Sequence, residues 1–270
     1  MLNSPWRKTA ATIYQKPRDS KIIGSVELDI TVLNAFIQQQ RQAGLKVTLT
    51  HVITLATARA MATELPALNT YIRRGNVVSH PQIDATISVL LKNAQMGTIR
   101  LEHADQLTLA EAVAAMTDKV KIARTTKDGS QELKTMLARI PWPFRQWMYQ
   151  LLYTLTVRWG FNLPGLTAHR FGSFVVSNIG SLGLDIGYPA LLPAANISFV
   201  LILGGHQEKP CVVDGQIVPR TLLKLGIAMD HRLLDAAQGG ELFRYLKQVV
   251  RWPEVLLEQL PAKAPSASSS

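Results

Sequence analysis

A histidine followed closely by a carboxylate is the feature of this sequence that could most directly do chemistry. Residues 226–235 read Gly-Ile-Ala-Met-Asp-His-Arg-Leu-Leu-Asp, so His231 follows an apolar run and Asp235 stands four residues further on. Imidazole has an unperturbed pKa of about 6.5, which suits proton transfer near neutral pH. Among the 6 histidines, no other has an apolar strand-like run behind it and a carboxylate so close ahead. The pattern indicates His231 as a candidate general base.

Both residues also have a structural interpretation. An aspartate followed three residues later by a glutamine, here Gln238, is typical of a capping box at the start of a helix. We therefore expect Asp235 to begin a helix over about residues 236–250 and not to carry protons. A histidine at the end of a strand can likewise serve only to satisfy nearby backbone groups, and the spacing alone leaves that alternative open for His231.

The remaining pattern predicts strands and helices in mixed order. Asp29 or Thr31 is expected to cap the first helix, and residues 108–111 form a capping box for a later one. Because the elements neither alternate regularly nor repeat, the chain is predicted to be an α+β domain. The expected strands and hairpins span 21–28, 71–78, 83–91, 171–177, 198–203, 211–218 and 222–229, and the expected helices span about 31–43, 48–64, 108–124 and 236–250.

Composition narrows the class of protein. With 270 residues, 47% hydrophobic and 18% charged, the chain is long enough for a substantial core. Cys211, its 1 cysteine, excludes an internal disulfide and is expected to be a buried packing thiol.

Residues 1–20 show no apolar core of a secretory signal, so we expect a cytoplasmic protein. No zinc-ligand spacing or nucleic-acid motif is present, so we expect neither a metal nor a nucleic-acid partner. The tail, 262–270, is expected to be disordered.

The net charge of +10 is partly regional. Residues 133–184 contain no aspartate or glutamate but several arginines, and the stretch 141–159 holds 3 of the 5 tryptophans. A basic, aromatic and amphipathic stretch is typical of a helix lying on a membrane surface, which would make the protein peripheral to a membrane. A lid over a lipidic acyl pocket and simple packing against its own or a neighbouring subunit are the alternatives.

Three segments near the C-terminus together resemble the catalytic domain of dihydrolipoyl acyltransferases, the core subunits of 2-oxoacid dehydrogenase complexes, whose relatives include chloramphenicol acetyltransferase. The order and spacing of the segments agree with that family, and a fainter match joins residues 6–10 to the Pro-Ala-Leu-Asn of 66–69. The similarity covers most of residues 5–260. The matching segments are 174–180, with its Ser-Asn-Ile-Gly, 208–218, and 230–235, with its Asp-His-Arg.

The resemblance implies a chloramphenicol acetyltransferase-like mixed sheet flanked by helices, in one catalytic domain over 1–261 with a helical insertion at about 134–163. It implies a coenzyme A-dependent acyltransferase that uses acyl-coenzyme A and a thiol or hydroxyl acceptor. His231 would be the general base and Ser177 the donor to the oxyanion, and the two would meet across the subunit interface of a homotrimer or a multiple of three. Asp235 would pair with Arg7 and hold the histidine loop.

The sequence departs from the family in ways that bear on function. Ala236 replaces the glycine that usually follows the aspartate, and it would strain the loop if that position needed a positive φ. Neither a lipoyl domain nor a subunit-binding domain stands before the catalytic segments, so this chain is expected to carry no lipoyl group and to meet a lipoyl or carrier domain in trans. Two other functions stay open: a catalytically inactive assembly protein, and condensation-type acyl transfer from a carrier-bound thioester.

Overall fold

A mixed sheet of six strands forms the body of the molecule. The computed structural model describes residues 20–91, 96–125, 141, 144–161, 171–191 and 195–260. The strand order is β1-β8-β7-β6-β4-β5, in which β6 runs parallel to β4 and β7 and the other neighbours are antiparallel. The strands are β1 (Lys21–Asp29), β4 (Ala85–Leu90), β5 (Met96–Leu101), β6 (Phe174–Asn178), β7 (Phe199–Val213) and β8 (Gln216–Asp230).

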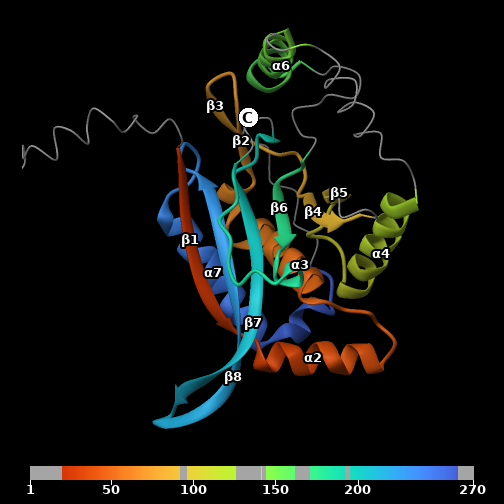
Figure 1. Ribbon diagram of the computed structural model, residues 1–270, viewed down its shortest axis with the longest axis vertical. Coiled ribbons are helices and arrows are strands. Elements are labelled where there is room, and N and C mark those ends of the chain that lie inside the picture. The colour runs from red at the N-terminus through yellow and green to blue at the C-terminus, as the bar shows by residue number, and fades with distance from the viewer. Residues whose placement is uncertain are drawn as a thin grey trace, which may run out of the picture.

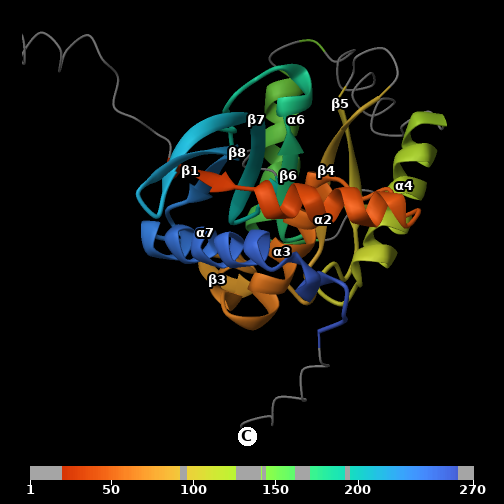
Figure 2. The same ribbon diagram turned by 90° about the horizontal axis from the view of Figure 1, so that it is seen from below.

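Three helices cover one face of this sheet and enclose the main core (Figure 1, Figure 2). They are α2 (Thr31–Gln42), α3 (Leu49–Thr63) and α7 (Ala236–Arg251), while α4 (Leu109–Thr125) packs beside β5. In that core the rings of Phe174 and Phe199 stack with their centroids 5.5 Å apart. The predicted α+β class, a mixed sheet flanked by helices, is therefore confirmed. Short 3-10 turns connect the elements: η1 (Pro66–Leu68), η4 (Gly180–Leu182) and η6 (Pro253–Leu256).

The central strands differ from the prediction. The strands expected at 198–203, 211–218 and 222–229 form one long hairpin, β7–β8, because a bulge between Leu203 and His206 lets the pairing continue past two glycines. The end of this hairpin projects beyond the body of the molecule (Figure 1). Its expected Asp-Gly turn is confirmed, with Asp214 at φ 50° and Gly215 at φ 78°. Strand β5 was not predicted at all.

Several local predictions need correction. Strand β6 begins at Phe174, not at 171, because Gly172 adopts a left-handed φ of 67°. The N-cap of α2 is Ile30, not Asp29 or Thr31 as predicted. Asp29 stands one residue before the N-cap, and its carboxylate accepts the backbone N–H of Thr31. Cys211 is half-buried, not buried, because it lies in the part of β7 that leaves the body of the sheet.

The segment at 144–161 is helical as far as Arg158 and lies against a small separate hairpin. This hairpin consists of β2 (Thr70–Arg73) and β3 (Asn76–Ser79), and the segment contains α6 (Phe144–Tyr153) and the π-helical turn η3 (Thr154–Arg158). Residues 134–140, 142–143 and 162–163 of the expected insertion, the whole tail at 262–270 and Arg7 lie outside the described residues. Among the helices that the structure describes, none has the length and apolar character needed to cross a bilayer.

Candidate acyl-transfer site

His231 follows β8 directly and stands at one end of the sheet. Its backbone N–H donates to the carbonyl oxygen of Ser20 at 2.8 Å, so the residue before β1 holds the start of the histidine loop. The imidazole is half exposed, with a side-chain exposure of 52%. The sequence predicted this position at the end of an apolar strand, and the structure confirms it.

The neighbours of the imidazole determine its tautomer. Nδ1 lies 3.0 Å from the carbonyl oxygen of Leu234 and 3.2 Å from Oδ1 of Asp235. Both neighbours are acceptors, so Nδ1 must carry the proton and donate it. In the neutral imidazole, Nε2 then keeps the lone pair. A histidine whose Nδ1–H is fixed by acceptors presents Nε2 as its basic nitrogen, which is the arrangement that a general base needs.

An ion pair between the buried Asp230 and the exposed Arg232 braces the loop on both sides of His231. Nε of Arg232 donates to Oδ1 and Oδ2 of Asp230 at 2.9 and 3.1 Å, and the backbone N–H of Arg232 donates to Oδ1 at 3.0 Å. Burial alone would raise the pKa of Asp230, but the hydrogen bonds from Arg232 and Ser20 outweigh it and hold that pKa below its ordinary value. Because Asp230 is ionised and multiply bonded, the residues before and after His231 are fixed in place. No local pattern in the sequence predicted this ion pair.

Asp235 caps α7, as predicted. It occupies the N-cap position, and Oε1 of Gln238 accepts its backbone N–H at 2.8 Å. Its carboxylate is largely exposed and also reaches His231, so one residue starts the helix and orients the imidazole. The predicted partner Arg7 lies outside the described residues, and that pair stays a prediction. Ala236 is the first residue of α7 and has no positive φ, so the alanine introduces no backbone strain.

Ser177 lies on the sheet face opposite the helices. Phe174 and Val176 point into the main core, and alternation along β6 therefore turns Ser177 to the other face, beside Ile202 of β7. This second face carries a small apolar cluster that includes Val200 and Ile202. Within the described part of the chain, the Ser177 hydroxyl has no hydrogen-bond partner, so it is available to donate.

The register of the sheet keeps Ser177 and His231 apart within one chain. Ser177 pairs with Ile202, whereas Asp230, the residue before His231, donates its backbone N–H to Ser198. Ile202 and Ser198 are four residues apart along β7, which corresponds to roughly 13 Å along the strand direction. Because β6 and β8 lie on opposite sides of β7, two strand spacings add about 10 Å across the sheet. A base and an oxyanion donor must both lie within hydrogen-bond reach of one reacting group. A single chain therefore does not bring the two side chains to one substrate.

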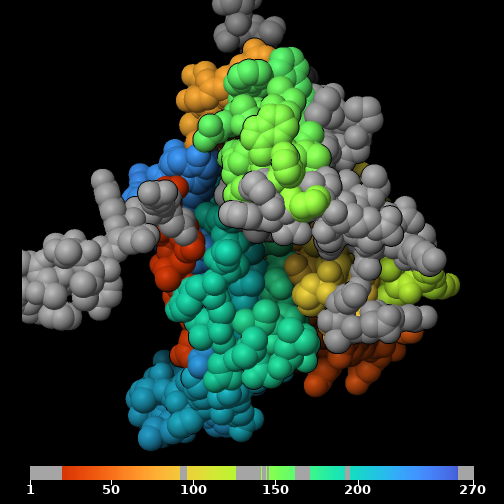
Figure 3. Space-filling model, turned by 45° about the horizontal axis from the view of Figure 1, so that its top comes forward, coloured from red at the N-terminus to blue at the C-terminus, as the bar shows by residue number. Residues whose placement is uncertain are grey.

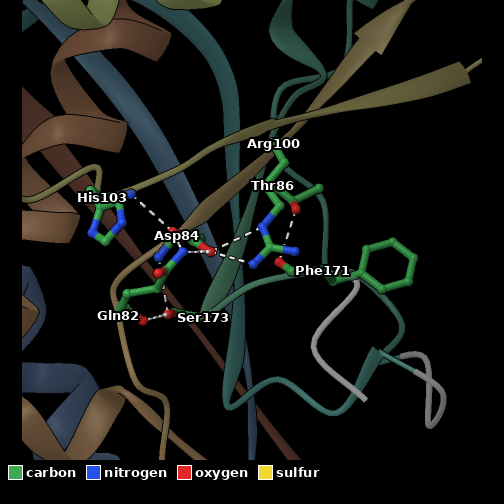
Figure 4. Close-up of polar contacts among 7 residues, drawn as sticks. All are labelled: Gln82, Asp84, Thr86, Arg100, His103, Phe171 and Ser173. Atoms are coloured by element: carbon green, nitrogen blue, oxygen red, sulfur yellow. Dashed lines mark hydrogen bonds and ion pairs between the residues drawn. The ribbon is translucent and has the colours of Figure 1, made fainter. Parts of the chain in front are cut away.

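A buried carboxylate anchors the start of the serine strand (Figure 4). Asp84 accepts hydrogen bonds from Nε of Arg100 at 3.0 Å, from Gln82, and from the backbone N–H of His103 at 2.9 Å. Burial would raise its pKa, but these hydrogen bonds outweigh the effect and lower it. Its backbone exchanges hydrogen bonds with Ser173, at 2.8 and 3.2 Å, just before β6. The network ties β4 and β5 to the strand that carries Ser177.

Glycines let the loop after Ser177 cross the sheet at close range. A side-chain carbon at Gly204 would overlap the backbone carbonyl of Asp185, and one at Gly226 would overlap that of Gly187. The backbone N–H of Gly205 donates to the carbonyl of Leu184 at 3.0 Å. These positions fix the course of the loop that leaves Ser177. The sequence analysis missed them, although two adjacent glycines inside a strand are a signal of close backbone approach.

A separate cavity of about 950 Å³ opens between the end of α3 and the turn before α4. It is lined by polar side chains that include Asn69, Gln82 and Asp105, and by neither Ser177 nor His231. Burial raises the pKa of Asp105. Among the described residues, no group of three or more His, Cys, Asp or Glu side chains is arranged to hold a metal ion.

The geometry can be compared with known proteins. Residues 168–258 match the family model of the 2-oxoacid dehydrogenases acyltransferase catalytic domain. The resemblance predicted from the sequence is confirmed. The chain is 23% identical over 258 residues to the dihydrolipoyllysine-residue acetyltransferase component of the acetoin cleaving system of Bacillus subtilis. That match covers 93% of this chain and 55% of the relative, so the chain spans about half the length of this acyltransferase.

Solved structures share the fold. A probable dihydrolipoamide acetyltransferase from Listeria monocytogenes superposes with a TM-score of 0.64 at 17% identity, covering 98% of this chain and 97% of that one. The dihydrolipoamide acetyltransferase of Azotobacter vinelandii superposes with a TM-score of 0.65 at 19% identity, covering 89% and 85%. At these identities the comparison establishes the shared fold, and the activity of this chain has to be argued from its own residues.

Proposed function

We propose that this protein is an acyltransferase that moves an acyl group between acyl-coenzyme A and a thiol or hydroxyl acceptor. His231 is the general base and Ser177 the oxyanion donor. The observation that carries the proposal is the fixed tautomer of His231, whose Nδ1–H is held by Leu234 and Asp235 so that Nε2 is the free base. A histidine that served only as a backbone-bonded residue would not need a carboxylate on the same nitrogen.

The reaction follows from these groups. Nε2 of His231 takes the proton of the acceptor as its sulfur or oxygen attacks the thioester carbonyl. The imidazolium that forms is stabilised by the Asp235 carboxylate at Nδ1. The Ser177 hydroxyl donates to the oxyanion of the tetrahedral intermediate, an effect that is typically worth about 3 kcal/mol. When the intermediate collapses, the carbon–sulfur bond to coenzyme A breaks and the departing thiolate takes the proton from His231. No acyl-enzyme is formed.

A comparison of spacings supports these roles. A serine, a histidine and an asparagine of the Azotobacter vinelandii enzyme have been studied for their part in catalysis, with the histidine 52 residues after the serine and the asparagine four residues after the histidine. In this chain His231 stands 54 residues after Ser177 (231 − 177), and Asp235 stands four residues after His231. We propose that Asp235 plays the part of that asparagine, because a carboxylate can hold the imidazolium more strongly than an amide can.

The site requires a second copy of the chain. Because the sheet register separates Ser177 from His231, we propose that the serine of one subunit faces the histidine of its neighbour in a homotrimer or a multiple of three. Several relatives of this chain are named dihydrolipoyllysine-residue acyltransferases. We therefore propose a dihydrolipoyl group as the first acceptor to test, delivered by a lipoyl or carrier domain in trans.

The direct test measures release of free coenzyme A thiol from a series of acyl-coenzyme A donors, with dihydrolipoamide and alcohol acceptors, for wild type and His231→Ala. We expect one donor–acceptor pair to turn over and the variant to be about 100- to 10,000-fold slower. Release from no pair would favour the inactive assembly protein. Turnover only with a carrier-bound thioester would favour condensation-type transfer. Equal rates for both proteins would show that His231 is not the base.

A further inference from the structure

Large aromatic side chains and arginines share one exposed surface formed by α6, η3 and the β2–β3 hairpin. Figure 3 shows α6 (green) lying beside this hairpin (orange) on the molecular surface. We call it the aromatic-basic surface. Its exposed members are Phe144, Trp147, Leu151, Trp159, Phe161 and Val77, together with Arg73, Arg74 and Arg158. None of these residues takes part in the proposed chemistry, so their exposure needs another explanation.

The apolar members lie on one face of α6. Phe144, Trp147 and Leu151 are spaced i, i+3 and i+7, which places them in one stripe along the helix. Phe144 and Trp147 are each 68% exposed. Scattered exposed apolar residues are ordinary, but a stripe that contains a tryptophan and a phenylalanine marks a surface that contacts a partner or a membrane.

The polar members carry one sign of charge. Residues 70–79 and 144–161 contain four arginines and no aspartate or glutamate. Nε of Arg74 donates to the carbonyl of Trp159 at 3.1 Å, and Arg73 donates to that of Gly160 at 3.3 Å. Carbonyl groups are neutral, so these contacts orient the guanidinium groups without cancelling their charge. Within the described residues, neither Arg73 nor Arg74 has an acidic partner.

The same contacts join the two elements into one unit. The backbone N–H of Arg74 donates to the carbonyl of Arg158 at 3.1 Å, and the Arg158 guanidinium lies 5.7 Å from the centre of the Tyr153 ring. The aromatic-basic surface is therefore one unit built from both elements.

We infer that the aromatic-basic surface docks on an anionic membrane. Arginines attract the phosphates of acidic lipids, and tryptophan and phenylalanine side chains enter the boundary between headgroups and acyl chains. The absence of any acidic residue from these segments gives the charge complementarity that an anionic bilayer requires. This inference does not depend on the proposed acyl transfer, because binding is measured without turnover.

The test is co-sedimentation with vesicles of phosphatidylglycerol and phosphatidylcholine, compared with phosphatidylcholine alone, at low and high salt. We expect binding only to the anionic vesicles, and weaker binding as salt rises. Trp147→Ala should weaken it about tenfold by removing one large apolar anchor. The matched control is Trp252→Ala, because Trp252 is 69% exposed after α7, outside the surface. Arg158→Gln should weaken binding about fivefold, and the exposed Arg251→Gln should not.

Three results would overturn the inference. The first is no binding to anionic vesicles at low salt. The second is an equal loss of binding in Trp147→Ala and Trp252→Ala, which would make the contact non-specific. The third is a drop in oligomer mass in Trp147→Ala by light scattering, which would show that a second copy of the chain covers this surface. Thermal unfolding of each variant, with an unchanged midpoint, ensures that a loss of binding is not a loss of folding.

Discussion

Mild acidification should destabilise the protein through one buried histidine at the start of α3. Thr48 is the N-cap of this helix, and Nδ1 of His51 accepts the backbone N–H of Thr48 at 3.1 Å. Because Nδ1 is the acceptor, it must be unprotonated in the folded state. Burial, with a further contribution from Arg41, lowers the pKa of His51 from 6.5 to about 4. Protonation therefore favours the unfolded chain.

These two pKa values determine how much stability is lost and in which pH range. The unfolded state binds the proton below pH 6.5 and the folded state only near pH 4, so stability falls as the pH falls between them. By linkage, one such group lowers the free energy of unfolding by about 1.4 kcal/mol between pH 7.5 and 5.5. The full loss approaches about 3 kcal/mol near pH 4. Carboxylates contribute little above pH 5.5, so this step can be separated from general acid unfolding.

Urea unfolding at fixed protein concentration, at both pH values, measures the effect in wild type and in His51→Gln. Glutamine suits the same N3 position of a capping box and does not titrate. His206→Gln, at an exposed position on β7, is the matched control. We expect wild type and the control to lose about 1.4 kcal/mol and His51→Gln to lose almost none. An equal loss in all three proteins would refute the assignment to His51.

Two further predictions concern buried contacts. Gly204→Ala should lower the free energy of unfolding by about 1–3 kcal/mol and should also slow turnover. The new side chain would displace the carbonyl of Asp185 in the loop after Ser177. The control is Gly240→Ala, which should do neither because the space around Gly240 is open. Arg59→Met should lower the free energy of unfolding, measured with urea, by about 2 kcal/mol or more. The reason is that the buried guanidinium donates to the carbonyls of Val255, Leu107 and Glu258. The control, Arg251→Met at an exposed position, should leave the free energy of unfolding unchanged.

Local signals in the sequence predicted local structure well. Thr108 and Glu111 form the expected capping box, with the Thr108 N–H donating to Glu111 at 2.8 Å. The Asp-Gly turn and the helix that starts after Asp235 are likewise determined by nearest neighbours. His231 was predicted at a strand end because a short continuous apolar run followed by Asp-His can be recognised without tertiary contacts.

Features that depend on distant segments were not predictable. Strand β5 contains Gly97 and exists because it pairs with β4 over its full length. His51 fills a capping position that usually takes glutamate or glutamine, and neighbouring elements bury it, which no local pattern in the sequence indicates. The close approach at Gly204 depends on where the loop after Ser177 crosses the sheet. Above all, the register that separates Ser177 from His231 is a property of the assembled sheet.

The most direct measurement mixes two inactive proteins. Ser177→Ala and His231→Ala are combined in equal amounts, subunits are exchanged by mild denaturation and refolding, and acyl transfer is assayed. In an equal mixture, half of the chains carry Ser177 and the other half carry His231. If each site takes its serine from one chain and its histidine from the next, a quarter of the sites have both residues. About a quarter of the wild-type activity should therefore return. A mixture that stays as inactive as its components, after mass spectrometry has shown mixed oligomers, would contradict a site built from two chains.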